Sequence, residues 1–233
     1  MEPTRARVAV VQFPGTNCER ETVRALQALS SQAEVIWHAD SFPQEGFAAV
    51  ILPGGFAHGD HLRAGAIARF SPVLSGIAEF ASRGGLVLGI CNGFQILLEA
   101  GLLPGAMLSN ASLQFRSEWV HCRVERTDTP FTSACQEGQI LKLPIAHGEG
   151  NYVLAEACAP DAVLRYCDVD GNVTAEANPN GSEANIAGVI SSQGNVFGLM
   201  PHPERANEPL LGSADGRSIF ESLLAAVRRP VLV

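Results

Sequence analysis

The clearest chemical signal in the chain is a cysteine set between two glycines. Cys91 lies in the run Gly89-Ile90-Cys91-Asn92-Gly93, after an apolar segment and before a segment with helical character. The same spacing with serine is the nucleophile elbow, a tight strand-to-helix turn that exposes the nucleophile at the end of a sheet. Glycines relieve clashes in such a turn, and the helix N-terminus favours a thiolate. This context predicts a nucleophile, although a cysteine taken alone is more often structural.

A thiol nucleophile needs a nearby base, commonly a histidine oriented by a third polar group. Two histidines stand in an H-x-E pattern, as His147-Gly148-Glu149 and His202-Pro203-Glu204. The spacing alone does not choose between them, and either fits an ordinary polar loop. His202, however, follows an apolar run and therefore lies at a predicted strand end. Because Pro203 favours an extended backbone at His202, Glu204 can project to the same side, and we predict a Cys91–His202–Glu204 triad.

Two backbone positions are candidates for stabilising negative charge on a substrate. The run Pro53-Gly54-Gly55-Phe56 ends a predicted strand, and paired glycines let peptide N–H groups approach a ligand closely. The N–H of Asn92, at the start of a predicted helix, is expected to face a developing oxyanion. Gly-Gly is also common in plain turns. The chain has no G-x-x-x-x-G-K-[ST] run, so we predict no phosphate loop.

Apolar segments alternate with helical segments in the first half of the chain. The predicted strands cover residues 7–13, 33–39, 47–52 and 85–90, and the predicted helices cover 17–30, 64–82 and 91–101. Thr16 or Asn17 is the predicted N-cap of the first helix. Such alternation indicates a parallel sheet with helices on both faces, whose ligands bind beyond the carboxyl ends of the strands.

The second half is richer in short apolar runs. They cover residues 120–124, 152–154, 186–190 and 196–200, and a closing helix is predicted over 214–228. Neither an internal repeat nor a linker divides the chain. We therefore expect residues 1–233 to form a single α/β domain with a mostly parallel central sheet.

Composition narrows the class of protein. The formal net charge is −8 with only 16 Lys+Arg, so nucleic acid is not an expected partner. The 6 cysteines form no C-x-x-C pair, so we expect reduced thiols and no metal site. Reduced thiols favour a cytoplasmic location. Apart from Cys91, the cysteines are predicted to be structural. No apolar run approaches the roughly 20 residues that span a bilayer, so no membrane association is expected.

Several longer phrases resemble the triad-type, or class I, glutamine amidotransferases, and among them the glutaminase subunits of phosphoribosylformylglycinamidine synthase. These phrases are Phe13-Pro14-Gly15-Thr16-Asn17-Cys18, Pro53-Gly54-Gly55-Phe56 through Gly59-Asp60 and Leu62-Arg63-Ala64-Gly65-Ala66, Gly89-Ile90-Cys91-Asn92-Gly93-Phe94-Gln95, Ala146-His147-Gly148-Glu149-Gly150 and Pro201-His202-Pro203-Glu204-Arg205. The first and third are more specific to this family than G-x-C-x-G, which many amidotransferases share. The chain departs from the family at His58 and His61, where a tyrosine and an aromatic residue are usual.

The resemblance implies a flavodoxin-like fold and the hydrolysis of glutamine through a thioester on Cys91. His202 would be base and general acid, Glu204 would orient it, and Gly55 and Asn92 would supply the oxyanion amides. The implied residues of the glutamine pocket are Gly54, Gly55, Phe56, Asn92, Gln95 and His147.

The resemblance also implies partners. Ammonia would pass to a separate synthetase subunit, working with a small third subunit, that converts formylglycinamide ribonucleotide to its amidine in purine synthesis. ATP and magnesium would bind that synthetase, and this chain would bind no cofactor.

Three alternatives remain open. A glutaminase of another pathway, such as pyridoxal phosphate synthesis, would share the chemistry, but the F-P-G-T-N-C opening argues against it. A cysteine hydrolase acting on peptides or folate γ-glutamyl tails would be active alone. A non-catalytic module would not be expected to retain Cys91, His202 and Glu204 together.

Overall fold

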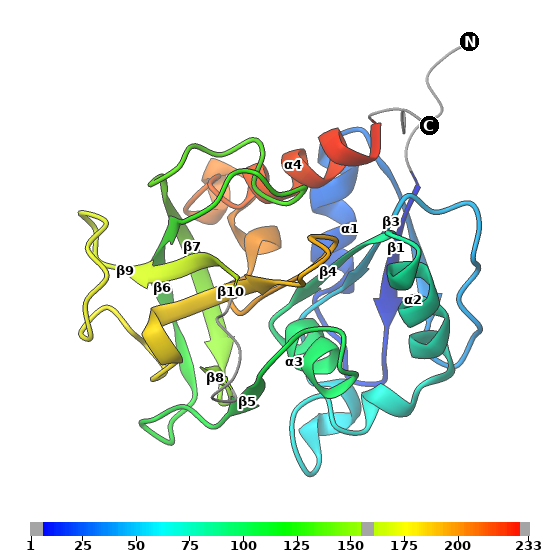
Figure 1. Cartoon of the computed structure of the whole chain (residues 1–233), viewed down its shortest axis with the longest axis horizontal. Coiled ribbons are helices and arrows are strands. Elements are labelled where there is room, and N and C mark those ends of the chain that lie inside the picture. Colours follow the sequence, from blue (N-terminus) through cyan, green and yellow to red (C-terminus); the bar gives the residue numbers. More distant parts are fainter. Residues whose placement is uncertain (1–6, 155–160, 229–233) are drawn as a thin grey trace.

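A nine-stranded sheet forms the centre of the computed structural model, which describes residues 7–154 and 161–228 (Figure 1). Its strand order is β2-β1-β3-β4-β11-β10-β9-β6-β7. In that order the strands are β2 Gln32–Trp37, β1 Arg7–Gln12, β3 Ala49–Leu52, β4 Leu86–Ile90, β11 Val196–Leu199, β10 Ile186–Ile190, β9 Ala162–Cys167, β6 Arg116–Val124 and β7 Ile140–His147. Pairing is parallel from β2 to β11 and antiparallel from β11 to β7.

Helices cover both faces of the parallel part. They are α1 Glu19–Ala28, α2 Pro72–Ser82, α3 Asn92–Glu99 and α4 Arg217–Arg228. The β1–α1–β2 connection runs toward one edge of the sheet and the β3–α2–β4 connection runs the other way. Because such crossovers are right-handed, α1 and α2 lie on opposite faces. Of the other two helices, α4 packs beside α1, and α3 packs on β3, β4 and β11. The predicted α/β fold with helices on both faces is confirmed.

The burial of the strands follows from this double cover. Every residue of β3 and β11 is buried, and β4 is buried except for its first residue. That pattern accounts for their continuous apolar sequences. The strand order reverses between β1 and β3, and α/β proteins bind ligands beyond the strand ends near such a reversal.

Two features of the predicted helices were wrong. Cys18, not Thr16 or Asn17, is the N-cap residue of α1, and the Thr16 hydroxyl instead accepts a hydrogen bond from the Phe13 N–H at 3.0 Å. The predicted helix over 64–82 is interrupted, because only a short 3₁₀ turn at Ala68–Phe70 precedes α2. Pro72 explains the break, since a proline starts a helix well but forces an extended backbone on the residue before it.

The antiparallel end of the sheet was only partly predicted. The strands β7 and β9 were missed, as was β5 (Ala106–Leu108), which pairs with β8 (Asn151–Val153) in a separate two-stranded sheet. Pro144 lies inside β7, and a proline argues against a central strand because it cannot donate a ladder hydrogen bond. The structure resolves this conflict by placing β7 at the edge of the sheet. Cys158, predicted to be structural, lies outside the described residues.

None of the helices in the described part of the chain is long and apolar enough to cross a membrane.

The approach of α3 to β3 is too close for any side chain at Gly93. A Cβ atom there would lie 1.9 Å from the carbonyl oxygen of Leu52. We expect Gly93→Ala to lower the free energy of unfolding by about 3 kcal/mol or more, because backbone must move to relieve this clash. Gly84→Ala is the control, since no atom lies within 4 Å of its Cβ and only its positive φ opposes the change; we expect about 1–2 kcal/mol there. Denaturant unfolding of both variants measures this, and equal losses would contradict the packing argument.

Candidate active site

Cys91 lies in the turn between β4 and α3, at the carboxyl end of the sheet. Its backbone has φ 48 and ψ −106, a conformation that costs a non-glycine residue about 1–3 kcal/mol. Its N–H donates to the carbonyl of Leu199 on β11 at 2.8 Å, and its carbonyl accepts the N–H of Gln95 at 3.1 Å. These bonds hold the strained turn in place on both sides. Cys91 therefore occupies a strand–turn–helix elbow.

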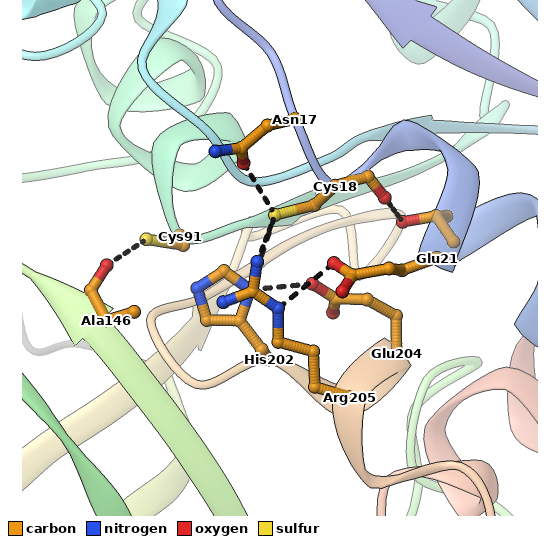
Figure 2. A network of polar contacts seen from close by, with 9 residues as sticks. Asn17, Cys18, Glu21, Cys91, Ala146, His202, Glu204 and Arg205 are labelled. Atoms are coloured by element: carbon orange, nitrogen blue, oxygen red, sulfur yellow. Dashed lines mark hydrogen bonds and ion pairs between the residues drawn. The ribbon is translucent and has the colours of Figure 1, made fainter. Parts of the chain in front are cut away.

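His202 and Glu204 lie together beyond the end of β11. The imidazole Nδ1 donates to Glu204 Oε1 at 2.6 Å, and both side chains are almost fully buried. Figure 2 shows the His202 ring between Cys91 and Glu204. The other ring nitrogen, Nε2, is buried and has no hydrogen-bonding partner among the described residues. The elbow and the H-x-E segment are thus brought to one place by the pairing of β4 with β11.

The charges around His202 favour its protonated form. Burial lowers the pKa of this imidazole, but the negative charges of Glu204 and of the Cys91 thiolate outweigh it and hold the pKa well above its usual range. A protonated imidazole beside a thiolate is the resting pair of many cysteine hydrolases. The arrangement can therefore supply a nucleophile and an acid at the same time.

A pocket of 280 Å³ opens on the Cys91 side of this pair. It is lined by Gly55, Phe56, Asp60, Cys91, Gln95, Phe115, Ala146, His147, Gly148 and Glu149. A larger hollow of 490 Å³ lies on the other side, where it reaches Glu204 and Arg205 but not Cys91. Because a nucleophile at Cys91 would have to contact its substrate, the smaller pocket is the candidate substrate site.

Two backbone N–H groups near Cys91 are candidates for stabilising an oxyanion. Asn92 is the first residue of α3, so its N–H has no acceptor within the helix and is available to an oxyanion. Gly55 lines the pocket from the opposite loop. Gly54 packs against the triad instead, since a Cβ atom there would lie 2.5 Å from the His202 ring. The glycine pair thus makes room both for the histidine and for a ligand.

Side chains of Asn92 and Gln95 tie the elbow to its neighbouring loops. Asn92 Oδ1 accepts the N–H of Ala57 at 3.0 Å, and its Nδ2 donates to Asp60 Oδ1 at 3.1 Å and to Gln95 Oε1 at 3.0 Å. Gln95 Nε2 donates to the carbonyl of Glu149 at 2.6 Å. These bonds fix the shape of the pocket wall beside Cys91.

Cys18 is a site neighbour that the sequence did not reveal. Its buried Sγ lies 4.0 Å from His202 Nδ1, on the other side of the ring from Cys91 (Figure 2). Arg205 donates to this sulfur at 3.1 Å and to Glu21 at 3.0 Å. Burial raises the pKa of the Cys18 thiol. A neutral thiol there contacts His202 without replacing Glu204 as the acceptor of the hydrogen bond from Nδ1.

The same buried groups have the donor types of a metal site. Cys18, His202 and Glu204 place ligand atoms within 4.8 Å of one another, and the S, N and O donors would suit zinc. The guanidinium of Arg205 already lies against the sulfur, and Glu204 already accepts the Nδ1 proton. Each of these three groups therefore already takes part in a hydrogen bond within the protein.

Comparison with known proteins identifies the family. Residues 5–218 match the CobB/CobQ-like glutamine amidotransferase domain. The chain is 53% identical over 225 residues to phosphoribosylformylglycinamidine synthase subunit PurQ of Moorella thermoacetica, covering 94% of this chain and 95% of the relative. It is 49% identical to PurQ of Pyrococcus furiosus, over 95% of this chain and 99% of the relative.

The chain belongs to the PurQ family. It is therefore a glutamine amidotransferase subunit, as the resemblance predicted, and neither a stand-alone cysteine hydrolase nor a non-catalytic module. The structure of PurLQS from Thermotoga maritima contains a similar chain, with a TM-score of 0.88, 44% identity and coverage of 96% and 100% of the two chains. A Thermoplasma acidophilum protein named as a GMP synthase component, with a TM-score of 0.64 and 15% identity over 96% of this chain and 94% of its own, shares the fold.

The predicted site residues of this PurQ-family chain fall into two groups. Gly55, Phe56, Gln95 and His147 line the pocket with Cys91. Gly54 and Asn92 are not among the lining residues; Gly54 contacts the His202 ring and Asn92 begins α3 next to Cys91. The departures from the family, His58 and His61, lie outside the lining, with the His58 ring stacked edge-on against His38 at 5.2 Å.

The electrostatic coupling within the triad is directly testable. Removing the charge of Glu204 by Glu204→Gln leaves burial as the dominant influence on His202, so we expect the pKa of His202 to fall markedly. NMR titration of the His202 ring measures this shift. Glu118→Gln, a change at a half-exposed surface carboxylate, is the matched control and should leave the titration unchanged. An unaltered His202 pKa in Glu204→Gln would show that Glu204 is not the source of the shift.

Proposed function

We propose that Cys91 attacks the side-chain amide of glutamine, assisted by His202 and Glu204. The observation that carries this proposal is the position of the His202 ring between the elbow cysteine and a buried carboxylate. The thiolate adds to the amide carbon and forms a tetrahedral intermediate whose oxygen is negatively charged. The N–H groups of Gly55 and Asn92 stabilise that oxygen.

Proton transfers then complete the reaction. His202 gives its proton to the amide nitrogen, the C–N bond breaks, and ammonia leaves a γ-glutamyl thioester on Cys91. The neutral His202 next takes a proton from water, whose oxygen attacks the thioester. Glutamate is released, and the thiolate and imidazolium are restored. Glu204 holds the imidazole in the required tautomer throughout, as its 2.6 Å bond to Nδ1 supports.

The ammonia acceptor belongs to partner subunits in this proposal. The names of the relatives and of the Thermotoga maritima complex support a separate synthetase subunit and a third, small subunit. That synthetase would use ATP and magnesium to convert formylglycinamide ribonucleotide to the amidine in purine synthesis. We propose that this chain binds neither and that it works in the cytoplasm.

We further propose that residues 1–233 form one amidotransferase domain. A continuous cluster of buried apolar residues, from Val8 on β1 to Leu224 on α4, supports this division of the chain.

Release of glutamate from glutamine tests the proposed nucleophile. We expect Cys91→Ala to lower this activity at least about 10⁴-fold, because the covalent route is lost. The assay is run on the full chain, alone and reconstituted with its synthetase partners. Cys167→Ala, which alters a buried cysteine of β9 away from the pocket, should retain activity. Undiminished glutamate release by Cys91→Ala would remove the thioester mechanism.

A further inference from the structure

Two carboxylates line the pocket beside Cys91 without an evident role in the triad chemistry. Asp60 and Glu149 come from different loops and both face this pocket. One oxygen of each is used within the protein, since Asp60 Oδ1 accepts from Asn92 and Glu149 Oε2 accepts from the N–H of Ala64. The second oxygen of each accepts no hydrogen bond from a described residue, so both remain available to a ligand.

Arg63 is a described cation whose charge interacts with Glu149 of this pair. Neither carboxylate forms an ion pair with a described arginine or lysine. Arg63, in the same loop as Asp60, donates from Nε and Nη2 to the carboxylate of Glu99 at 2.7 and 2.8 Å. Burial and the negative charge of Glu149 raise the pKa of Asp60 to about 6. The pocket therefore contains negative charge that a positively charged ligand would stabilise.

The hydrogen bonds around His147, a second residue of the pocket wall, fix which of its ring nitrogens carries the proton. Asn110 Oδ1 must be an acceptor because it receives the N–H of Gly150 at 2.9 Å, while Asn110 Nδ2 donates to two carbonyls. The His147 Nδ1 at 3.0 Å from this oxygen must therefore carry the ring proton.

The other ring nitrogen of His147 is consequently an acceptor. Burial and the charge of His202 lower the pKa of His147 to about 4, so the ring is neutral at physiological pH. His147 is 3% exposed, lines the pocket, and its Nε2 has no partner among the described residues. A buried acceptor without a partner is costly, and a ligand N–H in the pocket would satisfy it.

We propose that Asp60 and Glu149 bind the α-ammonium group of glutamine and thereby select an α-amino acid over a simple amide. This inference rests on the proposed glutaminase function and adds the group that recognises the amino acid. The carboxamide lies at Cys91, and the ammonium group at the far end of the substrate lies between the two carboxylates.

The link between the two ends is a single residue. Asn92 places its backbone N–H beside Cys91 while its side chain holds Asp60. Asp60 itself has a positive φ of 52, as does the neighbouring His58 at 54. Such a backbone costs free energy, and it fixes the carboxylate on the pocket wall rather than in solvent. Asn92 thus sets the position of the ammonium-binding carboxylate relative to Cys91.

The test compares glutamine with glutaramic acid, the same molecule without its α-amino group. Binding is measured by calorimetry in a Cys91→Ala background, so that neither ligand is hydrolysed, using the full chain alone and reconstituted with its synthetase partners. We expect Asp60→Asn and Glu149→Gln each to weaken glutamine binding about 10- to 100-fold, the range for a lost charge-assisted hydrogen bond. Glutaramic acid should bind each variant within about threefold of the Cys91→Ala parent.

Asp60→Asn is the sharper variant because an amide retains the shape and the bond to Asn92. Asp170→Asn, at an exposed acid in the loop after β9, is the matched control and should change neither affinity. Equal losses for both ligands in Asp60→Asn would mean that Asp60 only shapes the pocket, and would overturn the proposal. Unchanged glutamine affinity would overturn it as well.

The dependence on pH gives a second readout that a purely structural role would not show. The titratable or charged groups around Asp60 are Glu149, Cys91 and His147, with Arg63 beyond Glu149. With Cys91 replaced and His147 neutral, loss of the Asp60 charge is the expected event near pH 6. Glutamine affinity should therefore rise between pH 5 and 7.5 in the parent and remain nearly constant in Asp60→Asn. A pH dependence that persists in Asp60→Asn would assign the titration to another group.

Failure of this proposal is distinguishable from failure of the proposed function. If Cys91→Ala abolishes glutamate release while Asp60→Asn still binds glutamine normally, the triad mechanism is supported and the ammonium site is rejected. If Cys91→Ala remains active, the glutaminase mechanism falls whatever the carboxylates bind.

Discussion

The buried bond between His202 and Glu204 is the interaction on which the rest of the site depends. Taking a carboxylate and an imidazolium out of water costs several kcal/mol each, and only close pairing offsets that cost. The 2.6 Å bond meets this condition, but it leaves Nε2 and Glu204 Oε2 without partners among the described residues. The fold therefore maintains a polar pair that is complete only when a thiolate or a substrate faces it. Such incomplete satisfaction is expected at a catalytic site rather than in a structural core.

The sheet explains how this pair meets its nucleophile. The parallel pairing of β4 with β11 puts the elbow and the H-x-E segment at neighbouring strand ends, although more than a hundred residues separate them in the chain. The backbone bond from Cys91 to Leu199 makes the alignment specific to a single register. Packing of α3 against β3 then fixes the direction of the helix N-terminus. The strained conformation of Cys91 persists because strand, helix and neighbouring strand all hold it.

The triad could be predicted because each of its residues lies in a short sequence motif. The features that were missed depend on contacts between residues far apart in the sequence. Cys91, His202 and Glu204 each belong to a short motif whose geometry follows from a turn or an extended segment. Cys18 and His202 are 184 residues apart in the sequence, so no local pattern could predict their contact. Asp60 stood within a recognised phrase, but its role depends on Glu149 from a distant loop. The parallel strands were predicted because they are uniformly apolar, whereas β7 was missed because Pro144 is tolerated only at an edge that the sequence does not specify.

The electrostatics of the pocket have opposite sign on its two sides. Toward the triad, a histidine that favours its protonated form faces the nucleophile; toward the solvent-facing loops, Asp60 and Glu149 accumulate negative charge. Glutamine matches this arrangement, because its side-chain amide can face the triad while its ammonium group faces the two carboxylates. Asp60 costs the empty protein stability, because an acid whose pKa is raised by folding destabilises the native state once the pH exceeds the pKa of its unfolded form. A bound cation offsets that cost by stabilising the ionised carboxylate. The pocket therefore favours a ligand that carries an ammonium group over one that lacks it.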